Sequence, residues 1–188
     1  MIELRPFAGL GHADHGWLDA RHYFSFADYR DPARMGWGSL HEWNDDTIAA
    51  GSGFPPHPHN DMEIVTFVRT GAISHRDSRG EEPSWRQREF PRVDRSGQWI
   101  TLASGTSEAK EALPIRADAH VMVAYLRPGE SVTYETEPDR HVYRVATSGS
   151  VKVNGQPLGP RDGVAIAAET AITVEAVDDA EVVMVDAR

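Results

Sequence analysis

The second half of the chain is a series of short segments with strand-like sequence, and this pattern limits the possible folds more than any other feature. The segments are rich in β-branched residues, alternate apolar with polar positions and are separated by turn residues. They cover residues 97–103, 120–126, 130–135, 141–146, 150–154, 163–167, 171–176 and 181–186. No helical pattern longer than a turn or two interrupts them. We therefore expect an all-β fold, in the form of a small antiparallel barrel or a double-sheet jelly roll.

Turn residues and the N-terminus agree with this fold class. Asn154-Gly155 is a dipeptide typical of a tight two-residue hairpin, and residues 161–163, Arg-Asp-Gly, predict a second turn. Residues 2–6 alternate apolar and charged side chains, which predicts a short strand at the start of the chain.

Three further segments in the first half have a readable pattern. Residues 37–43 alternate Trp, Ser, His and Trp, which predicts a strand, and residues 44–46 predict a turn. Residues 63–69 are apolar or β-branched at nearly every position, which is typical of a strand buried on both faces. Residues 70–71 then predict a hairpin turn before a return strand over residues 72–76.

Charge and cysteine content exclude several classes of function. The 29 acidic and 19 basic side chains give a formal charge of −10, so the chain would repel the phosphate backbone of a nucleic acid. The absence of cysteine excludes disulfides, thiolate nucleophiles and cysteine-based zinc sites. Because no segment has the apolar length of a signal peptide or a membrane span, we expect a soluble cytoplasmic protein that does not bind membranes.

The stretch from residue 51 to residue 80 carries the clearest chemical signal. His57 and His59 are one residue apart, and on an extended strand such residues point to the same side, so two imidazoles would reach one point. Neighbouring prolines restrict the backbone that carries them. Imidazole suits iron, copper, nickel and zinc, and Glu63 adds a carboxylate four residues later. The alternative is a surface histidine pair in a proline-rich loop.

The other histidines have a simpler interpretation. His12 and His15 could form a second metal pair, but on a loop they share no fixed face, which favours a structural role. His75 could line the same cavity as His57 and His59, or be a strand histidine with satisfied hydrogen bonds. His120 and His141 have no partner at ligand spacing, so the C-terminal barrel is predicted to be structural.

The residues around this motif resemble a known family. Gly51, His57, His59, Glu63 and Gly71 resemble the first conserved motif of the cupin superfamily, although Gly71 lies one residue later than the usual spacing. More specifically, GHADHGWLDARHYFSFADYRDPARMGWGSL at 11–40 and HPHNDMEIVTFVRTGAISHRDS at 57–78 resemble the pirin family, particularly its bacterial quercetinase-like members. The resemblance implies a bicupin built from RmlC-like jelly rolls.

The chain departs from that family after Gly80. In pirin-like proteins a second motif supplies a His and a Glu that complete the metal site, whereas here the sequence runs directly into a linker-like segment. The most similar stretch, SGTSEAKEA at 104–112, has Lys110 where a histidine is needed. We therefore expect a shortened N-terminal cupin half-barrel over 1–80, a linker over 81–96 and a complete C-terminal cupin barrel over 97–188.

Two functions follow from the resemblance. The first is a non-catalytic or weakly metal-binding pirin-like protein with a degraded site. The second is a metal-dependent dioxygenase resembling quercetin 2,3-dioxygenase, which acts on a flavonol-like substrate. Where a metal is bound, His57, His59 and Glu63 would hold it as a divalent transition metal, iron being the first candidate although the ligands do not fix its identity. The non-catalytic protein could also be metal-free. In the second, Glu63 would also be the catalytic base.

An open half-barrel raises the question of what covers it. A partial barrel exposes a sheet edge and apolar faces, which the chain's own C-terminal barrel or a second copy could cover. We expect a homodimer that pairs the shortened N-terminal sheets about a twofold axis, bringing His57 and His59 of the two copies toward each other.

Overall fold

The computed structural model describes residues 1–59, 61–75, 86–106 and 109–188. Within them, almost all regular structure is β, with two single-turn 3-10 helices. In chain order the elements are β1 (Ile2–Arg5), η1 (Phe7–Gly9), β2 (Gly11–Asp14), β3 (Leu18–His22), β4 (Asn44–Ile48), η2 (Arg92–Arg95), β5 (Ile100–Ser104), β6 (Leu113–Pro114), β7 (Ala119–Leu126), β8 (Ser131–Glu135), β9 (His141–Ser148), β10 (Val151–Val153), β11 (Gln156–Leu158), β12 (Gly163–Ala167), β13 (Ala171–Ala176) and β14 (Ala180–Ala187).

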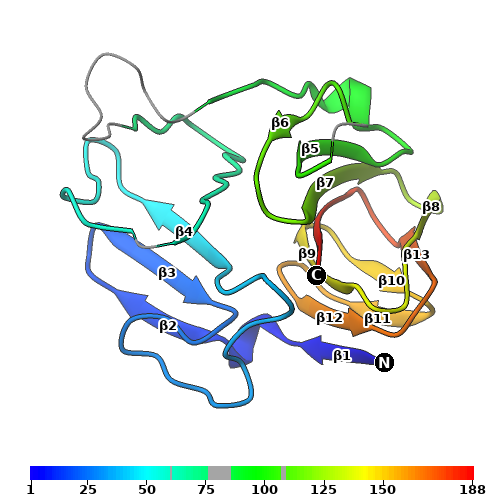
Figure 1. Cartoon of the computed structure of the whole chain (residues 1–188), viewed down its shortest axis with the longest axis horizontal. Coiled ribbons are helices and arrows are strands. Elements are labelled where there is room, and N and C mark those ends of the chain that lie inside the picture. The colour runs from blue at the N-terminus through cyan, green and yellow to red at the C-terminus, as the bar shows by residue number, and fades with distance from the viewer. Residues whose placement is uncertain (60, 76–85, 107–108) are drawn as a thin grey trace.

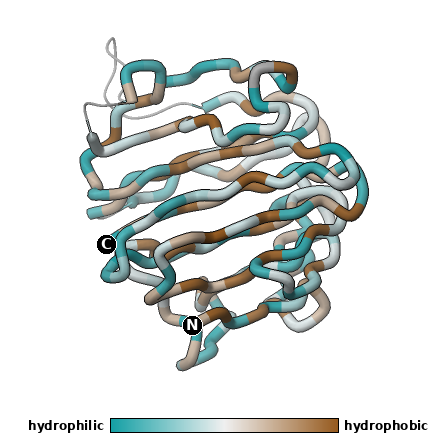
Figure 2. Tube along the Cα trace, turned by 90° about the vertical axis from the view of Figure 1, so that its right-hand side faces the viewer, coloured by the Kyte–Doolittle hydropathy of each residue, from teal (hydrophilic) through white to brown (hydrophobic). Residues whose placement is uncertain are grey.

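Two sheets form the C-terminal barrel, which comprises β5–β14 together with β1. The larger sheet has the strand order β1-β12-β9-β14-β7-β5-β6, and the smaller has the order β11-β10-β13-β8 (Figure 1). Their inner faces share one apolar core, to which Met122, Val164 and Met184 of the larger sheet and Val151 and Ile172 of the smaller contribute. The strands lie stacked across the view in Figure 2, and their colours alternate between hydrophobic and hydrophilic along the chain.

The first strand of the chain is part of this barrel. Strand β1 pairs antiparallel with β12, from Ile2 opposite Ile166 to Arg5 opposite Gly163. The guanidinium of Arg5 is buried, with its Cζ 5.0 Å from the centre of the Phe24 ring. The N-terminus therefore ties the two halves of the molecule together before the N-terminal sheet begins.

The N-terminal lobe, residues 7–75, contains the three-stranded sheet β2-β3-β4. Alternate residues of β3 are buried on one face, and Tyr23 and Phe24, directly after it, are fully buried. Phe24 packs against Tyr143 of β9 with ring centroids 4.8 Å apart, and Tyr23 donates a hydrogen bond to the carbonyl of Arg161 at 2.6 Å. The lobe thus docks on the outer face of the C-terminal barrel.

The structure confirms the all-β cupin fold and most of the strand positions in the second half. Asn154 and Gly155 both have positive φ, as a tight hairpin between β10 and β11 requires. The two-residue strand β6 had no clear signal in the sequence. Among the described residues, no helix is long and apolar enough to cross a membrane.

Several predictions for the first half were wrong. Residues 37–43 form no strand, because the chain turns where Trp37 and Leu40 exchange backbone hydrogen bonds. Residues 44–46 are not a turn but the start of β4, which pairs with β3. Residues 63–69 form no strand, and they are exposed apart from the half-buried Phe67.

The predicted return strand begins at residue 72, where the described part also has no strand, and its last residue, 76, lies outside the described residues. The predicted boundary at 80 and the start of the linker at 81 also lie in the undescribed range 76–85. The division into 1–80, 81–96 and 97–188 therefore stays a prediction.

Candidate functional site

The two histidines of the predicted metal motif lie together on the surface of the N-terminal lobe. Their ring centroids are 4.5 Å apart and the ring planes are nearly perpendicular, at 82°. Both side chains are exposed, and the segment that carries them belongs to no strand. The two rings are therefore in contact, and a proline-rich loop brings them together where the sequence predicted a strand.

Two ring contacts help to orient His57. Its Nδ1 lies 2.7 Å from the carbonyl oxygen of Pro55, a contact in which Nδ1 is the donor. Its ring also makes an edge contact with Phe54, which in turn packs against Trp17. Because Nδ1 carries the proton, the Nε2 of His57 is left as the ligand atom, an arrangement common for metal-binding histidines.

The chemistry of this pair fits part of a transition-metal site. Two neutral imidazoles are suitable ligands for late first-row ions, but a stable site needs at least one more protein donor. Among the described residues, no group of three His, Cys, Asp or Glu side chains is arranged to hold a metal. His57 and His59 are thus brought together, and Glu63 does not join them in a ligand group.

Glu63 instead binds the chain at the start of the C-terminal barrel. Its carboxylate accepts hydrogen bonds from the backbone N–H of Arg116, at 2.8 and 2.9 Å, and from that of Ala117, at 2.8 Å. These contacts join the N-terminal lobe to the loop between β6 and β7. The assignment of Glu63 as ligand and base stays a prediction, and the carboxylate has this structural role beside it.

Three of the other histidines lie in local networks. His12 pairs with Asp19 at 3.5 Å, and the buried His22 has its Nδ1 2.9 Å from Asn44 Oδ1. His120 Nδ1 lies 3.0 Å from the hydroxyl of Ser104. These contacts agree with the structural role predicted for His12 and His120. Lys110 is exposed.

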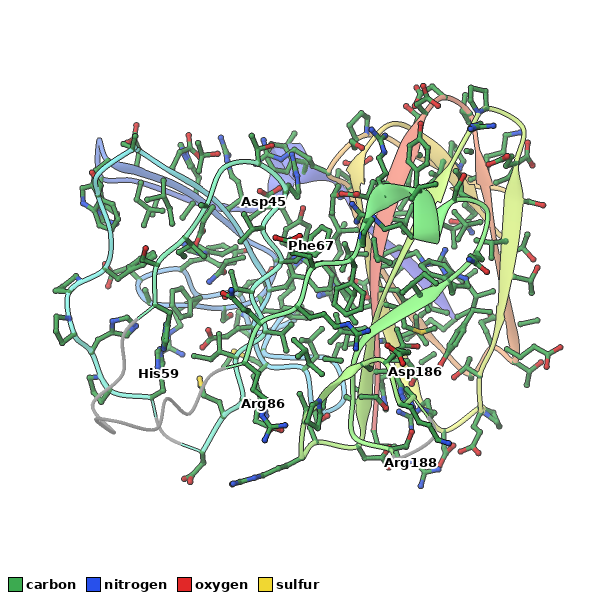
Figure 3. All side chains as sticks on the ribbon, turned by 90° about the horizontal axis from the view of Figure 1, so that it is seen from above. Asp45, His59, Phe67, Arg86, Asp186 and Arg188 are labelled. Atoms are coloured by element: carbon green, nitrogen blue, oxygen red, sulfur yellow. The ribbon has the colours of Figure 1, made fainter. Side chains whose placement is uncertain are left out.

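A second polar site lies at the mouth of the C-terminal barrel, and the sequence did not predict it. A cavity of about 520 Å³ opens there, a size typical of small-molecule pockets. It is lined by Thr106, Asp118, His120, Tyr134, Glu135, Thr136, Glu137, Arg140, Asp186 and Arg188. Figure 3 shows Asp186 and Arg188 in the C-terminal barrel and His59 in the N-terminal lobe. Phe67 lies between the lobe and the barrel.

The carboxylate of Asp186 is the centre of that mouth. It is fully buried and accepts hydrogen bonds from Tyr134 Oη at 2.6 Å, from Thr136 Oγ1 at 2.8 Å and from Arg140 Nε. Burial and the hydrogen bond to Asp186 raise the pKa of Tyr134, while the hydrogen bond from Arg140 lowers that of Asp118. No fixed spacing links these residues in the sequence, so only the fold brings them together.

Comparisons with known proteins match the whole chain. A family model described as Pirin matches residues 4–113, and one described as a quercetinase C-terminal cupin domain matches residues 97–187. A pirin-like protein of Caulobacter vibrioides is 46% identical, with 100% of both chains covered. A quercetin 2,3-dioxygenase of Escherichia coli K12 is 32% identical, with 99% of this chain and 98% of that protein covered.

The solved structures agree with these matches. The crystal structure of YhhW from Escherichia coli superposes with a TM-score of 0.83 at 28% identity, covering 100% of this chain and 98% of that one. A second structure of the same bacterial pirin, in complex with nickel(II), gives a TM-score of 0.82 at 28% identity and covers 100% and 99% of the two chains.

The alignment lengths show that this chain is shorter than its relatives. The match to the Caulobacter protein extends over 231 positions, 43 more than the 188 residues of this chain, and it covers both chains completely. At least those 43 positions must therefore be internal gaps in this chain. A shortening of this kind agrees with the second motif that the sequence lacks.

Proposed function

Because this chain belongs to the pirin family of cupin proteins, we propose that it is a pirin-like bicupin that binds a divalent transition metal weakly through His57 and His59 and has no oxygenase activity. The observation that supports the proposal is the isolated histidine pair. Its two rings are 4.5 Å apart, and no third His, Cys, Asp or Glu among the described residues completes a ligand group.

The bound ion would be held by the Nε2 of His57 and by an imidazole nitrogen of His59. Iron is the first candidate, and the nickel(II) complex of the bacterial pirin YhhW makes nickel a useful probe. When bound, such an ion supplies Lewis acidity and, for iron, a change of oxidation state. With two protein ligands it would keep most of its water, so we expect fast exchange and low affinity.

A quercetin 2,3-dioxygenase activity is the second candidate, favoured by the named relative in Escherichia coli K12. A flavonol would need a base to remove its hydroxyl proton. Glu63 is the carboxylate that the sequence offers, but it already accepts three hydrogen bonds from backbone N–H groups of residues 116 and 117. Those bonds hold both carboxylate oxygens of Glu63 on the backbone of residues 116 and 117, away from a bound substrate. We therefore rank catalysis second.

An assay of flavonol consumption under O2 separates the two functions. Purified protein would be supplied in turn with Fe(II), Cu(II), Mn(II) and Ni(II), beside the His57→Ala/His59→Ala double variant. A His12→Ala variant is the matched control, because His12 is also a surface histidine of the lobe. We expect equal, background rates in all three proteins. Turnover that the double variant loses and His12→Ala retains would establish the dioxygenase instead.

A further inference from the structure

Residues 62–70 form an exposed segment that contacts the rest of the described molecule through a few side chains. Glu63 accepts backbone hydrogen bonds from residues 116 and 117, and Phe67 packs against the apolar cluster on the outer face of β5, β7 and β14. Arg69 lies 3.8 Å from Asp45 of β4. The other apolar side chains of the segment are exposed, with Ile64 58%, Val65 43% and Val68 44% exposed.

The backbone of this segment pairs with no strand of the described residues. No backbone–backbone hydrogen bond joins residues 62–70 to another described residue, although the sequence is β-branched and favours a strand. Unpaired N–H and C=O groups beside exposed apolar side chains are a template for pairing with another strand. In the relatives, at least 43 additional positions are available to cover such a surface.

The segment is symmetric about Thr66 in three respects. Its ends are set by Asp61 and Gly71, which both have positive φ and lie five residues either side of Thr66. In an antiparallel pair of two copies centred on Thr66, Ile64 of one copy would face Val68 of the other. Glu63 of one copy would come opposite Arg69 of the other, so no like charges meet at either end while each side chain keeps its contact within its own chain.

We propose that residues 62–70 are the interface of a homodimer, in which two copies pair antiparallel about a twofold axis through Thr66. A twofold axis makes the same patch serve on both copies, and the symmetry of the sequence meets this requirement. The register differs from the shared four-histidine site expected from the sequence. Because Thr66 lies on the axis, the His57–His59 pairs of the two copies fall on opposite sides of it.

Disulfide trapping tests this register directly, because the chain contains no cysteine. In a Thr66→Cys variant the two thiols would face each other at a Cα separation of about 4.5–5.5 Å, within the range that a disulfide accepts. Ser52→Cys is the control, since Ser52 is exposed on the same lobe but outside the segment. At low micromolar concentration, we expect oxidised Thr66→Cys to run as a covalent dimer on a non-reducing gel. We expect Ser52→Cys to form at least tenfold less covalent dimer.

Mass measurement by light scattering supplies the second readout. Wild-type protein should have twice the 20.8 kDa mass of one chain, and an Ile64→Lys/Val68→Lys variant should be monomeric. Val177→Lys is its control, because Val177 is 53% exposed on the C-terminal barrel. A monomeric wild type, or a dimer that survives Ile64→Lys/Val68→Lys without preferential trapping at position 66, would overturn the proposal. Neither readout depends on metal, so the proposed function can fail while the interface stands.

Discussion

At the scale of single residues, two buried arginines of the C-terminal barrel differ in whether their charge has a partner. Arg140 lies at the mouth, where its guanidinium donates to Asp186 and Asp118. Arg144 lies inside the barrel with no exposed surface, and its Nε and Nη1 have no hydrogen-bond partner. Its nearest polar contact is the Sδ of Met184, 3.5 Å from Nη2. Burial lowers the pKa of Arg144 to about 9.

We predict that Arg144→Met stabilises the protein. A buried charge without a partner disfavours the folded state, and methionine fills a similar volume without that penalty, so the free energy of unfolding should rise by about 1–4 kcal/mol. Because the folded-state pKa is below the unfolded value, the penalty is complete below about pH 9 and shrinks as the pH rises above it. Urea unfolding at pH 7 and pH 10 measures both effects.

The control for that series is Arg127→Met, which changes an exposed arginine and should alter stability little. If Arg144→Met lowers the free energy of unfolding while Arg127→Met leaves it unchanged, the interpretation of Arg144 as a buried charge without a partner is wrong.

At the scale of elements, the sequence predicted the C-terminal strands well and the N-terminal segments poorly. The C-terminal strands alternate with the barrel interior, so local pattern and tertiary position agree. Residues 44–46 carry turn-forming side chains, but pairing with β3 recruits them into β4. Residues 63–69 have strand-forming side chains, but no described segment pairs with them, and they form no strand. Long-range pairing decided both cases, and a local pattern does not contain it.

The residues of the candidate site likewise fall into those that the sequence predicted and those that it missed. His57 and His59 were predictable because both belong to one short motif, whose geometry is local. The contact of Glu63 with residues 116 and 117 was not predictable, because it depends on how the lobe docks. The Asp186 network was missed because its members come from β8, β14 and the loop that precedes β9, with no spacing signal in the sequence.

The loop from β8 to β9 gives a prediction at this scale, because it carries Arg140 across the barrel mouth to the fully buried Asp186. Tyr134→Phe removes one donor to that carboxylate and should lower the free energy of unfolding by about 1–3 kcal/mol. Arg140→Met leaves the carboxylate without its counter-charge and should lower it by about 3–5 kcal/mol. Exposed Arg188→Met is the control, and its stability is expected to stay close to that of wild type. Urea unfolding gives all three values, and a larger loss in Tyr134→Phe than in Arg140→Met would contradict the account.

At the scale of the whole molecule, a complete barrel supports an incomplete one. The C-terminal barrel has a closed apolar core and a polar mouth, and it holds the N-terminal lobe through β1, the aromatic residues after β3 and the carboxylate of Glu63. Where the structure describes it, the lobe consists of the three-stranded sheet β2-β3-β4, loops and the exposed segment 62–70, while the match to the Caulobacter protein extends over 231 positions. Within the described residues the first histidine pair is present, and no third His, Cys, Asp or Glu side chain joins it in a group that could hold a metal.

Titration of the metal-free protein with nickel(II) by calorimetry tests this account most directly, with the His57→Ala/His59→Ala variant alongside. We predict one ion per chain in the wild type, with a dissociation constant on the order of micromolar or weaker because only two imidazoles hold the ion, and no binding to the variant. Identical titrations of the two proteins would show that His57 and His59 hold no metal and would contradict the central claim.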